Sequence, residues 1–422
     1  MARMRREYYR VDVTNTWTRR DFLKKAGIVS SLISSTPVRS LLAAPTDGTP
    51  PEIVNKRMNI YEQLGVRPLI NAAGTYTALS ACTMPPEVVR AMDEASRYHV
   101  SIPELQAAVG KRIANLLGAE SAVVTAGAAA ALTLGTAACV TGKDQSKIQR
   151  LPGADGMKNE VIIQRSHRFG FDHAIRAVGV RLIEVETRAE LESAINAKTA
   201  MLFFLNHADA LGRVRRNEFA EIGKKAAIPT FIDAAADVPP SARLSEYTKL
   251  GFDLAAFSGG KGLRGPQCSG LLIGRADLIE AASLNGSPHS DTIGRAAKIG
   301  KEEIVGLLTA LELYLKRDHE AEWREWESRV REIAAALKNV RGVKTEMFVP
   351  EIANQCPHLR VEWEEQVIPK SNTDIVTLLR EGDPRIEVRP SPGDRPMLEI
   401  GVWMLQPSEV HVVARRLREV LS

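Results

Sequence analysis

The chain has 422 residues, and 44% of them are hydrophobic, which is enough to fill the cores of a large α/β domain and a smaller one. Its net charge of +5 is concentrated at the N-terminus, because residues 1–46 hold nine Lys or Arg against three Asp or Glu and so carry +6. The rest of the chain therefore carries about −1, which argues against a basic surface for tRNA or any other nucleic acid.

Residues 1–46 come first in chain order and have the pattern of an export leader. Arg19 and Arg20 are followed by Phe22-Leu23-Lys24 and a mildly apolar stretch, which fits a signal for the twin-arginine translocase. The sequence therefore predicts an exported, periplasmic protein that crosses the membrane folded. An amphipathic N-terminal helix or a leader without function, in a cytoplasmic protein, is the alternative. No other stretch approaches the roughly eighteen apolar residues of a membrane helix.

Residues 47–300 are predicted to form the large domain, with residues 52–70 packing on the smaller one. Apolar strands alternate with helical stretches in this region, which predicts an α/β fold with a mostly parallel sheet. Ligands of such sheets gather at the carboxyl ends of the strands, so polar residues at those ends are candidates for a site. These residues are Thr125, Arg165, Asn206, Asp233 and Ser258.

A helix with a small-residue start follows the strand that ends at Thr125. Gly127, Ala128 and Ala129 would expose bare backbone amides at the positive end of the helix dipole, which suits a phosphate dianion. Close packing of an alanine-rich helix on the sheet would require the same small residues. The two interpretations are compatible, and both stay open.

Lys261 lies in a glycine-crowded stretch after a predicted strand, and Asp233 ends another strand 28 residues earlier. Pyridoxal 5'-phosphate (PLP) needs a lysine amine that holds it as a Schiff base and a carboxylate that keeps its pyridine nitrogen protonated. Ser258 would add a hydroxyl to the phosphate site, and Asp237 is the alternative carboxylate. The pair of Lys261 and Asp233 therefore predicts a PLP site.

Two other interpretations of Lys261 are open. A nucleotide-binding P-loop requires Gly-x-x-x-x-Gly-Lys-Ser/Thr, but Gly262 follows this lysine and Ala255 stands where the first glycine should be. A solvated lysine in a structural turn is the simpler alternative. No metal site is predicted, because the four cysteines are scattered without Cys or His at ligand spacing. They are Cys82, Cys139, Cys268 and Cys356.

Three segments resemble a known family: residues 257–261 (Phe-Ser-Gly-Gly-Lys), Gly265-Pro266-Gln267 and, early in the domain, residues 71–75 (Asn-Ala-Ala-Gly-Thr). Over roughly residues 52–422 the chain is similar to the fold-type-I PLP enzymes of the selenocysteine synthase and D-glucosaminate ammonia-lyase group. Selenocysteine synthases usually have Asp where this chain has Gly260, and Gly where it has Arg264. The chain therefore looks closer to the lyase-like branch.

The resemblance implies a fold-type-I architecture, with a large domain followed by a bridging helix and a smaller α+β domain in residues 301–422. It also implies PLP as the cofactor and a homodimer or larger homo-oligomer. In this fold a flat side chain covers the cofactor ring, and His167, just after a strand, is the first candidate. His207, at another strand end, would bond the phenolic oxygen or the substrate, or else stabilise its own loop.

Many amino-acid PLP enzymes hold the substrate carboxylate with an arginine on a late strand, where this chain has Glu399 instead. Substrate-binding candidates are therefore drawn from four other positions. These are Thr75, Arg264, Arg389 and Arg395.

Together these features predict a lyase that eliminates water or ammonia from a hydroxylated amino acid or amino-sugar acid through an external aldimine and a quinonoid. Lys261 would remove the α-proton, while Asp233 stabilises the protonated ring. One alternative is a seryl-tRNA selenium transferase, which the nearly neutral body disfavours. Another is a PLP- or metabolite-binding protein without catalysis, which the presence of both Lys261 and Asp233 disfavours.

Overall fold

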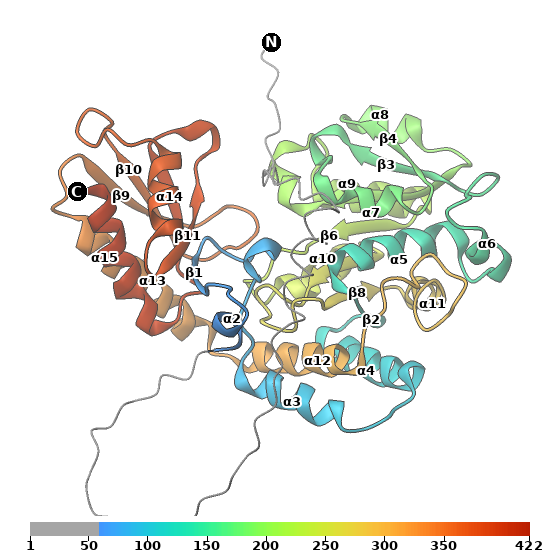
Figure 1. The fold of residues 1–422 in the computed structure, drawn as a ribbon. Coiled ribbons are helices and arrows are strands. Elements are labelled where there is room, and N and C mark those ends of the chain that lie inside the picture. Colours follow the sequence, from blue (N-terminus) through green and yellow to red (C-terminus); the bar gives the residue numbers. More distant parts are fainter. Residues whose placement is uncertain (1–58) are drawn as a thin grey trace, which may run out of the picture. The chain divides into compact units, whose positions relative to one another are not determined.

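The computed structural model describes residues 59–422. The leader predicted at residues 1–46 lies outside them. The described residues hold a seven-stranded sheet and a five-stranded sheet, each covered by helices (Figure 1). This architecture agrees with the predicted α/β class. None of the helices in residues 59–422 is long and apolar enough to span a bilayer.

The seven-stranded sheet has the order β2-β8-β7-β6-β5-β3-β4. β8 runs antiparallel to both of its neighbours, and the other pairs are parallel. The carboxyl ends of β5, β6 and β7 therefore lie side by side, which places the residues after these strands at one edge of the sheet. The bounds are β2 (Ser121–Thr125), β3 (Glu160–Gln164), β4 (Arg181–Val185), β5 (Thr199–Leu205), β6 (Thr230–Asp233), β7 (Leu254–Ser258) and β8 (Gly270–Gly274).

Helices cover both faces of this sheet, and each face has its own apolar core. On one face α5 lies so close to the strands that a Cβ at Gly135 would be 2.4 Å from the Phe231 ring. That face is covered by α5 (Gly127–Thr141), α7 (His173–Arg176) and α11 (Ala276–Leu284). The opposite face is covered by α4 (Ile102–Leu117), α8 (Arg188–Ala194), α9 (Arg216–Ala226), α10 (Arg243–Leu250) and α12 (Lys301–Lys316).

The five-stranded sheet has the order β1-β11-β12-β10-β9 and combines the two ends of the described chain. β1 pairs in parallel with β11, with Leu69 opposite Arg385, and the other pairs are antiparallel. Residues just N-terminal to the large sheet thus complete the small one. The bounds are β1 (Leu69–Ala72), β9 (Val343–Phe348), β10 (His358–Trp363), β11 (Arg385–Pro390) and β12 (Met397–Gly401).

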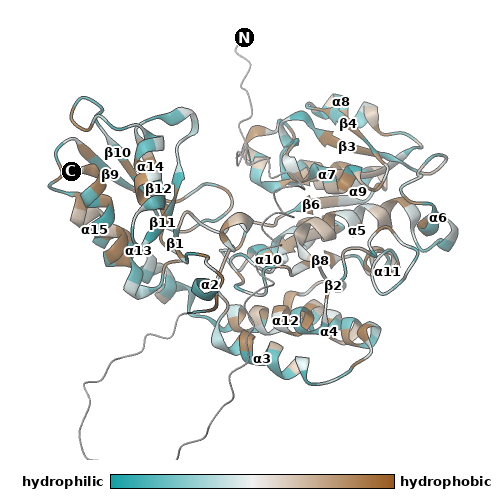
Figure 2. Cartoon of the chain, in the orientation of Figure 1, coloured by the Kyte–Doolittle hydropathy of each residue, from teal (hydrophilic) through white to brown (hydrophobic). Residues whose placement is uncertain are grey.

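One face of the small sheet is covered by α13 (His319–Leu337), α14 (Asn372–Glu381) and α15 (Val410–Leu421). Figure 2 shows both hydrophobic and hydrophilic residues on α13 and α15, as expected for helices that bury one side. The chain passes from the large core to the small one between α12 and α13. The remaining helices are α2 (Ile60–Gln63), α3 (Pro86–Ser96), which packs on α12, and α6 (Gln145–Arg150).

Candidate active site

Lys261 is held by a tight loop that follows β7. A Cβ at Gly259 would lie 2.1 Å from Ser269 Oγ, and one at Gly260 would lie 2.5 Å from the Cα of Gln267, so the loop requires glycine at both positions. Burial lowers the pKa of the Lys261 amine, although Asp233 and Asp237 act in the opposite direction. A larger fraction of the Lys261 amine is therefore in the neutral, nucleophilic form than in a solvated lysine.

Asp233 is the last residue of β6 and is only 6% exposed. Its Oδ1 accepts a hydrogen bond from the amide of Ala235 at 2.9 Å, whereas Oδ2 makes no side-chain hydrogen bond within residues 59–422. Burial raises the pKa of Asp233, and the Ala235 amide and the charge of Lys261 lower it. An unpaired carboxylate oxygen on a largely buried residue, within reach of the charge of Lys261, suits a cationic ring nitrogen.

The start of α5 forms a cradle for a phosphate. No side chain caps this helix, because its N-cap residue is Ala126, so the amides at Gly127–Ala129 are left for a ligand. Gly270 at the start of β8 allows the close approach, since a Cβ there would lie 2.3 Å from the Gly127 carbonyl carbon. Ser258 stands directly opposite Gly270 across the β7–β8 ladder. The cradle, the amine and the open carboxylate together fit PLP.

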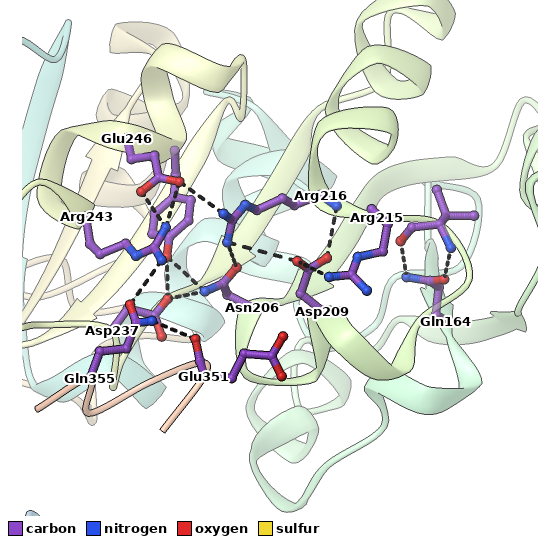
Figure 3. A network of polar contacts seen from close by, with 12 residues as sticks. Gln164, Asn206, Asp209, Arg215, Arg216, Asp237, Arg243, Glu246, Glu351 and Gln355 are labelled. Atoms are coloured by element: carbon purple, nitrogen blue, oxygen red, sulfur yellow. Dashed lines mark hydrogen bonds and ion pairs between the residues drawn. The ribbon is translucent and has the colours of Figure 1, made fainter. Parts of the chain in front are cut away.

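Asp237 is buried too, but its carboxylate is already engaged. Its Oδ2 accepts hydrogen bonds from the Tyr247 hydroxyl at 2.6 Å and from the Asn206 side-chain amide at 2.8 Å (Figure 3). Asp233 therefore suits the role of partner to the ring nitrogen better than Asp237 does.

The ring-covering role predicted for His167 does not fit the structure. His167 is 0% exposed and packs edge-on against Phe204, whose side chain belongs to the core on the sheet face opposite α5. Its Nδ1 accepts the Leu205 amide at 3.2 Å, and its Nε2 lies 3.2 Å from Gln164 Nε2. The residue is a core histidine on the far side of the sheet from the phosphate cradle.

His207 lies nearer to the lysine. It is exposed, and partial loss of solvent together with the charges of Arg389 and Lys261 lowers its pKa. The small sheet therefore brings Arg389 into the same electrostatic environment as Lys261 and His207. This agrees with a contact to cofactor or substrate, and the role of His207 stays a prediction.

Arg264 does not point freely into the site as the substrate role predicted. Its guanidinium donates to the carbonyl of Trp403 at 3.0 Å and pairs with Glu322 on α13 at 3.4 Å. Its φ of 58° lies in the left-handed region that a non-glycine residue rarely adopts. These contacts connect the lysine loop to the small-sheet region, so the structure supports a structural role for Arg264.

Thr75 follows β1 in the chain and is buried, and residues shortly after it reach the lysine loop. The Gln267 side-chain amide donates to the carbonyl of Thr77 at 2.9 Å, and Cys82 Sγ lies 3.7 Å from the Gly265 carbonyl. The residues that follow the segment 71–75 therefore contact the lysine loop at Gly265 and Gln267. A substrate role for Thr75 stays a prediction.

Arg389 and Arg395 line a pocket of about 420 Å³ on the small-sheet face that lies away from α13–α15. Arg389 is paired with Glu399 at 3.1 Å, and Arg360 reaches the same carboxylate at 3.7 Å. The glutamate on the late strand thus sets the position of two arginines. A larger pocket of about 690 Å³ lies beside the edge strand β2, away from Lys261.

Sequence reasoning missed Tyr247, Arg243 and Trp403. Tyr247 and Arg243 lie on α10, where their spacing is typical of any amphipathic helix, so no pattern marked them. Trp403 follows β12 and is 1% exposed, and its aromatic size was the one available sign of a structural role. Among residues 59–422, no group of three or more His, Cys, Asp or Glu is arranged to hold a metal ion.

Comparison with known proteins identifies the family. A family model described as L-seryl-tRNA selenium transferase (SelA) matches residues 63–341. The D-glucosaminate-6-phosphate ammonia lyase of Salmonella typhimurium is 31% identical over 378 residues, covering 86% of this chain and 98% of the relative. The 5'-C-glycyluridine monooxygenase-decarboxylase of a Streptomyces species is also 31% identical, covering 86% of this chain and 92% of the relative.

A solved structure of D-glucosaminate-6-phosphate ammonia-lyase superposes with a TM-score of 0.76 at 30% identity, covering 86% of this chain and 98% of that one. This chain belongs to the SelA family. The predicted family and its fold-type-I architecture are thereby confirmed.

Proposed function

We propose that this protein is a PLP-dependent lyase that eliminates water or ammonia from a hydroxylated amino acid or amino-sugar acid. The observation that carries the proposal is the half-buried Lys261 amine beside the open oxygen of Asp233, at the strand edge where the uncapped α5 begins. When bound, PLP supplies an electron sink for the negative charge left on a carbon that loses a proton.

Lys261 has two roles in this proposal. Its amine holds the cofactor covalently, and once the substrate amine has taken its place, the freed amine accepts the α-proton. Burial lowers the pKa of Lys261, which increases the neutral fraction that this base needs near neutral pH. The turn at Gly259 and Gly260 fixes the backbone from which the Lys261 side chain would reach the cofactor in one role and the α-proton in the other.

Asp233 and α5 hold the cofactor at its two ends. The Asp233 carboxylate, placed by the end of β6, keeps the proton on the ring nitrogen. The amides at the start of α5 and the Ser258 hydroxyl take the phosphate. Arg389, whose charge acts on His207 and whose guanidinium also pairs with Glu399, is the candidate cation for the substrate carboxylate.

Two experiments test the proposal. Borohydride reduction followed by peptide mass mapping should show a pyridoxyl adduct on Lys261; an adduct on another lysine would refute the assignment. A panel of amino acids and amino-sugar acids should then give a keto acid, with ammonia release, at the same rate in air and without oxygen. Turnover that needs oxygen and releases carbon dioxide would favour the chemistry named for the Streptomyces relative.

We also propose that the protein is exported through the twin-arginine translocase and works as a homo-oligomer. Arg19, Arg20 and the following Phe22-Leu23-Lys24 support export. Tyr98 and Val100, which are 64% and 50% exposed beside a pocket of about 380 Å³, support a contact between copies. Sedimentation of the holoenzyme and of Tyr98→Glu tests this contact, because a purely monomeric wild-type protein would contradict it.

A further inference from the structure

Asp237 is a second buried carboxylate at the candidate site, and the proposed reaction assigns no role to it. It closes the turn that follows Asp233, since its amide donates to the carbonyl of Ala234 at 3.1 Å. Asp237 is 3% exposed and Asp233 is 6% exposed, so the short segment 233–237 carries two carboxylates away from water. Burying a second carboxylate is costly unless other groups hold it.

Two side chains hold this carboxylate and also bond to each other, so that the three groups form a closed triangle (Figure 3). Tyr247 and Asn206 both donate to Asp237 Oδ2, and Asn206 also donates to the Tyr247 hydroxyl at 2.9 Å. Arg216 in turn holds the Asn206 carbonyl oxygen at 3.3 Å. Because each member is held by the others, the carboxylate has little freedom to turn away.

The same turn is held from the small-domain side. The amide of Asn354 donates to the carbonyl of Ala236 at 2.8 Å, and Arg243 donates to Gln355 at 3.0 Å while pairing with Glu246. The loop between β9 and β10 therefore contacts the turn that carries both carboxylates.

The groups that face Asp237 are Asp233, Tyr247, Arg243, Asn206 and Lys261. Burial and the Asp233 charge raise the pKa of Asp237 to about 6, and the hydrogen bonds from Tyr247 and Asn206 act against the rise. Asp237 is therefore charged above about pH 6. Its field reaches the lysine, because both carboxylates raise the pKa of the Lys261 amine.

We propose that Asp237, held by Tyr247 and Asn206, is a positioning residue that keeps a second negative charge behind Asp233 and so helps hold the ring nitrogen of bound PLP in its protonated form. The inference rests on the proposed function, because it assumes that Lys261 carries PLP. It assigns Asp237 an electrostatic role in addition to its structural one.

The test is the nitrogen-15 NMR titration of holoenzyme reconstituted with PLP labelled at the ring nitrogen. Asp237→Asn keeps the shape and an acceptor oxygen but removes the charge. The protonation constant of the ring nitrogen should fall at least about tenfold, since a nearby charge shifts a pKa by one unit or more. Asp209→Asn is the matched control, because it removes another buried charge of the network that does not act on Lys261. It should change the constant less than about twofold.

Tyr247→Phe supplies a second, milder variant in case Asp237→Asn folds poorly. Losing the hydroxyl raises the pKa of Asp237, because the Tyr247 hydrogen bond acts to lower it. As the pH falls, Asp237 of the Tyr247→Phe variant should therefore take up its proton at a higher pH than in the wild type, where this happens only below about pH 6. The support that the Asp237 charge gives to the protonated ring nitrogen should be lost at that higher pH. Thermal unfolding of each apo variant reports whether it is folded.

An unchanged nitrogen-15 titration in folded Asp237→Asn or Tyr247→Phe protein, with the cofactor on Lys261, would overturn this inference alone. Absence of any adduct on Lys261 would instead refute the proposed function. Equal shifts of the ring-nitrogen titration in Asp237→Asn and Asp209→Asn would also contradict the role proposed for Asp237, because they would indicate a general loss of packing.

Discussion

At the scale of single residues, the two groups that matter most are Asp233 and Lys261, because the fold changes the ionisation of both. One is a carboxylate with an open oxygen in a buried position, and the other is an amine whose neutral form is favoured by burial. A cationic ring nitrogen would supply the charge partner that Asp233 lacks, and holding PLP as a Schiff base would remove the cost of burying a charged Lys261 amine. Substitutions here should therefore change chemistry more than stability.

Replacing Asp233 by Ala should leave PLP bound and slow the loss of the α-proton. A buried cation without its partner loses roughly 3–5 kcal/mol of stabilisation, by analogy with broken buried ion pairs. Each ~1.4 kcal/mol that reaches the barrier costs about tenfold, so we expect a slowdown of at least about a hundredfold. Deuterium exchange at the substrate α-carbon measures it. Exchange at the wild-type rate would mean that another carboxylate serves the ring.

His167 should make stability depend on pH. Burial lowers its pKa to about 4, below its value in the unfolded chain, so the neutral form is favoured by folding. The resulting stability is complete above about pH 6.5 and is lost as the pH falls towards 4; between about pH 7.5 and about pH 5 the loss is about 2 kcal/mol. Urea unfolding at these two values measures it. His167→Gln should show a smaller difference, and an equal one would contradict this prediction.

The structure places Asp233, the Lys261 loop and the start of α5 at the edge where parallel strands end, where polar strand-end residues are expected to gather, and their roles stay predictions. Strand-end reasoning failed for His167, because a short turn of 3-10 helix over Arg165–His167 directs this side chain to the opposite face of the sheet. Arg264 could not be predicted either. Its direction depends on a left-handed backbone angle and on a carbonyl 139 residues away.

At the scale of secondary structure, the junction of β8 and α5 decides whether a phosphate fits. Gly270 is the residue that allows the helix start to approach the sheet, because its missing Cβ leaves room for the backbone of Gly127 and Ala128. The amides that would bind phosphate are thus placed by a glycine on a neighbouring strand.

Gly270→Ala should weaken PLP binding at least about tenfold, because the new Cβ would force the start of α5 away from the position that suits the phosphate. Fluorescence titration of the apoenzyme with PLP measures the dissociation constant. Gly170→Ala is the matched control, since a Cβ there meets no atom within 4 Å. Equal affinities in the two variants would place the phosphate elsewhere.

The alternation of strands and helices was predictable because buried parallel strands are short apolar runs bounded by polar turns. The composition of the small sheet was harder. Residues 52–70 were expected to pack on the smaller domain, but a short run such as Leu69–Ala72 contains nothing that specifies a parallel pairing with Arg385–Pro390. Such register depends on tertiary contacts that a local pattern does not encode.

At the scale of the whole molecule, the charge distribution separates residues 1–46 from the rest of the chain. Removing residues 1–46 takes away +6 and leaves about −1. Binding to several phosphates of tRNA would require a comparable number of clustered Lys or Arg. A protein beginning at Asp47 should therefore show no tight, salt-sensitive binding of seryl-tRNA in filter-binding assays; such binding would favour selenium transfer.

Changing Arg19 and Arg20 to Lys should keep the protein in the cytoplasm while its activity on small amines survives. The reason is that the translocase recognises the arginine pair, whereas the folded enzyme in residues 59–422 is unchanged. Cell fractionation followed by immunoblotting measures the location. If the native and altered chains both stay in the cytoplasm, the leader has no export role.

The pairing of β1 with β11 has a consequence for how the protein is made. The large sheet draws its strands from residues 121–274 and can form while the ribosome is still working, but Leu69 meets Arg385 only when synthesis is nearly over. Until then β1 has no partner, and Arg389, which lies on β11, is not in place. A chain that ends before β11 would therefore contain Lys261 but neither Arg389 nor the partner strand of β1, so the candidate site and the small sheet are completed only by the last part of the chain.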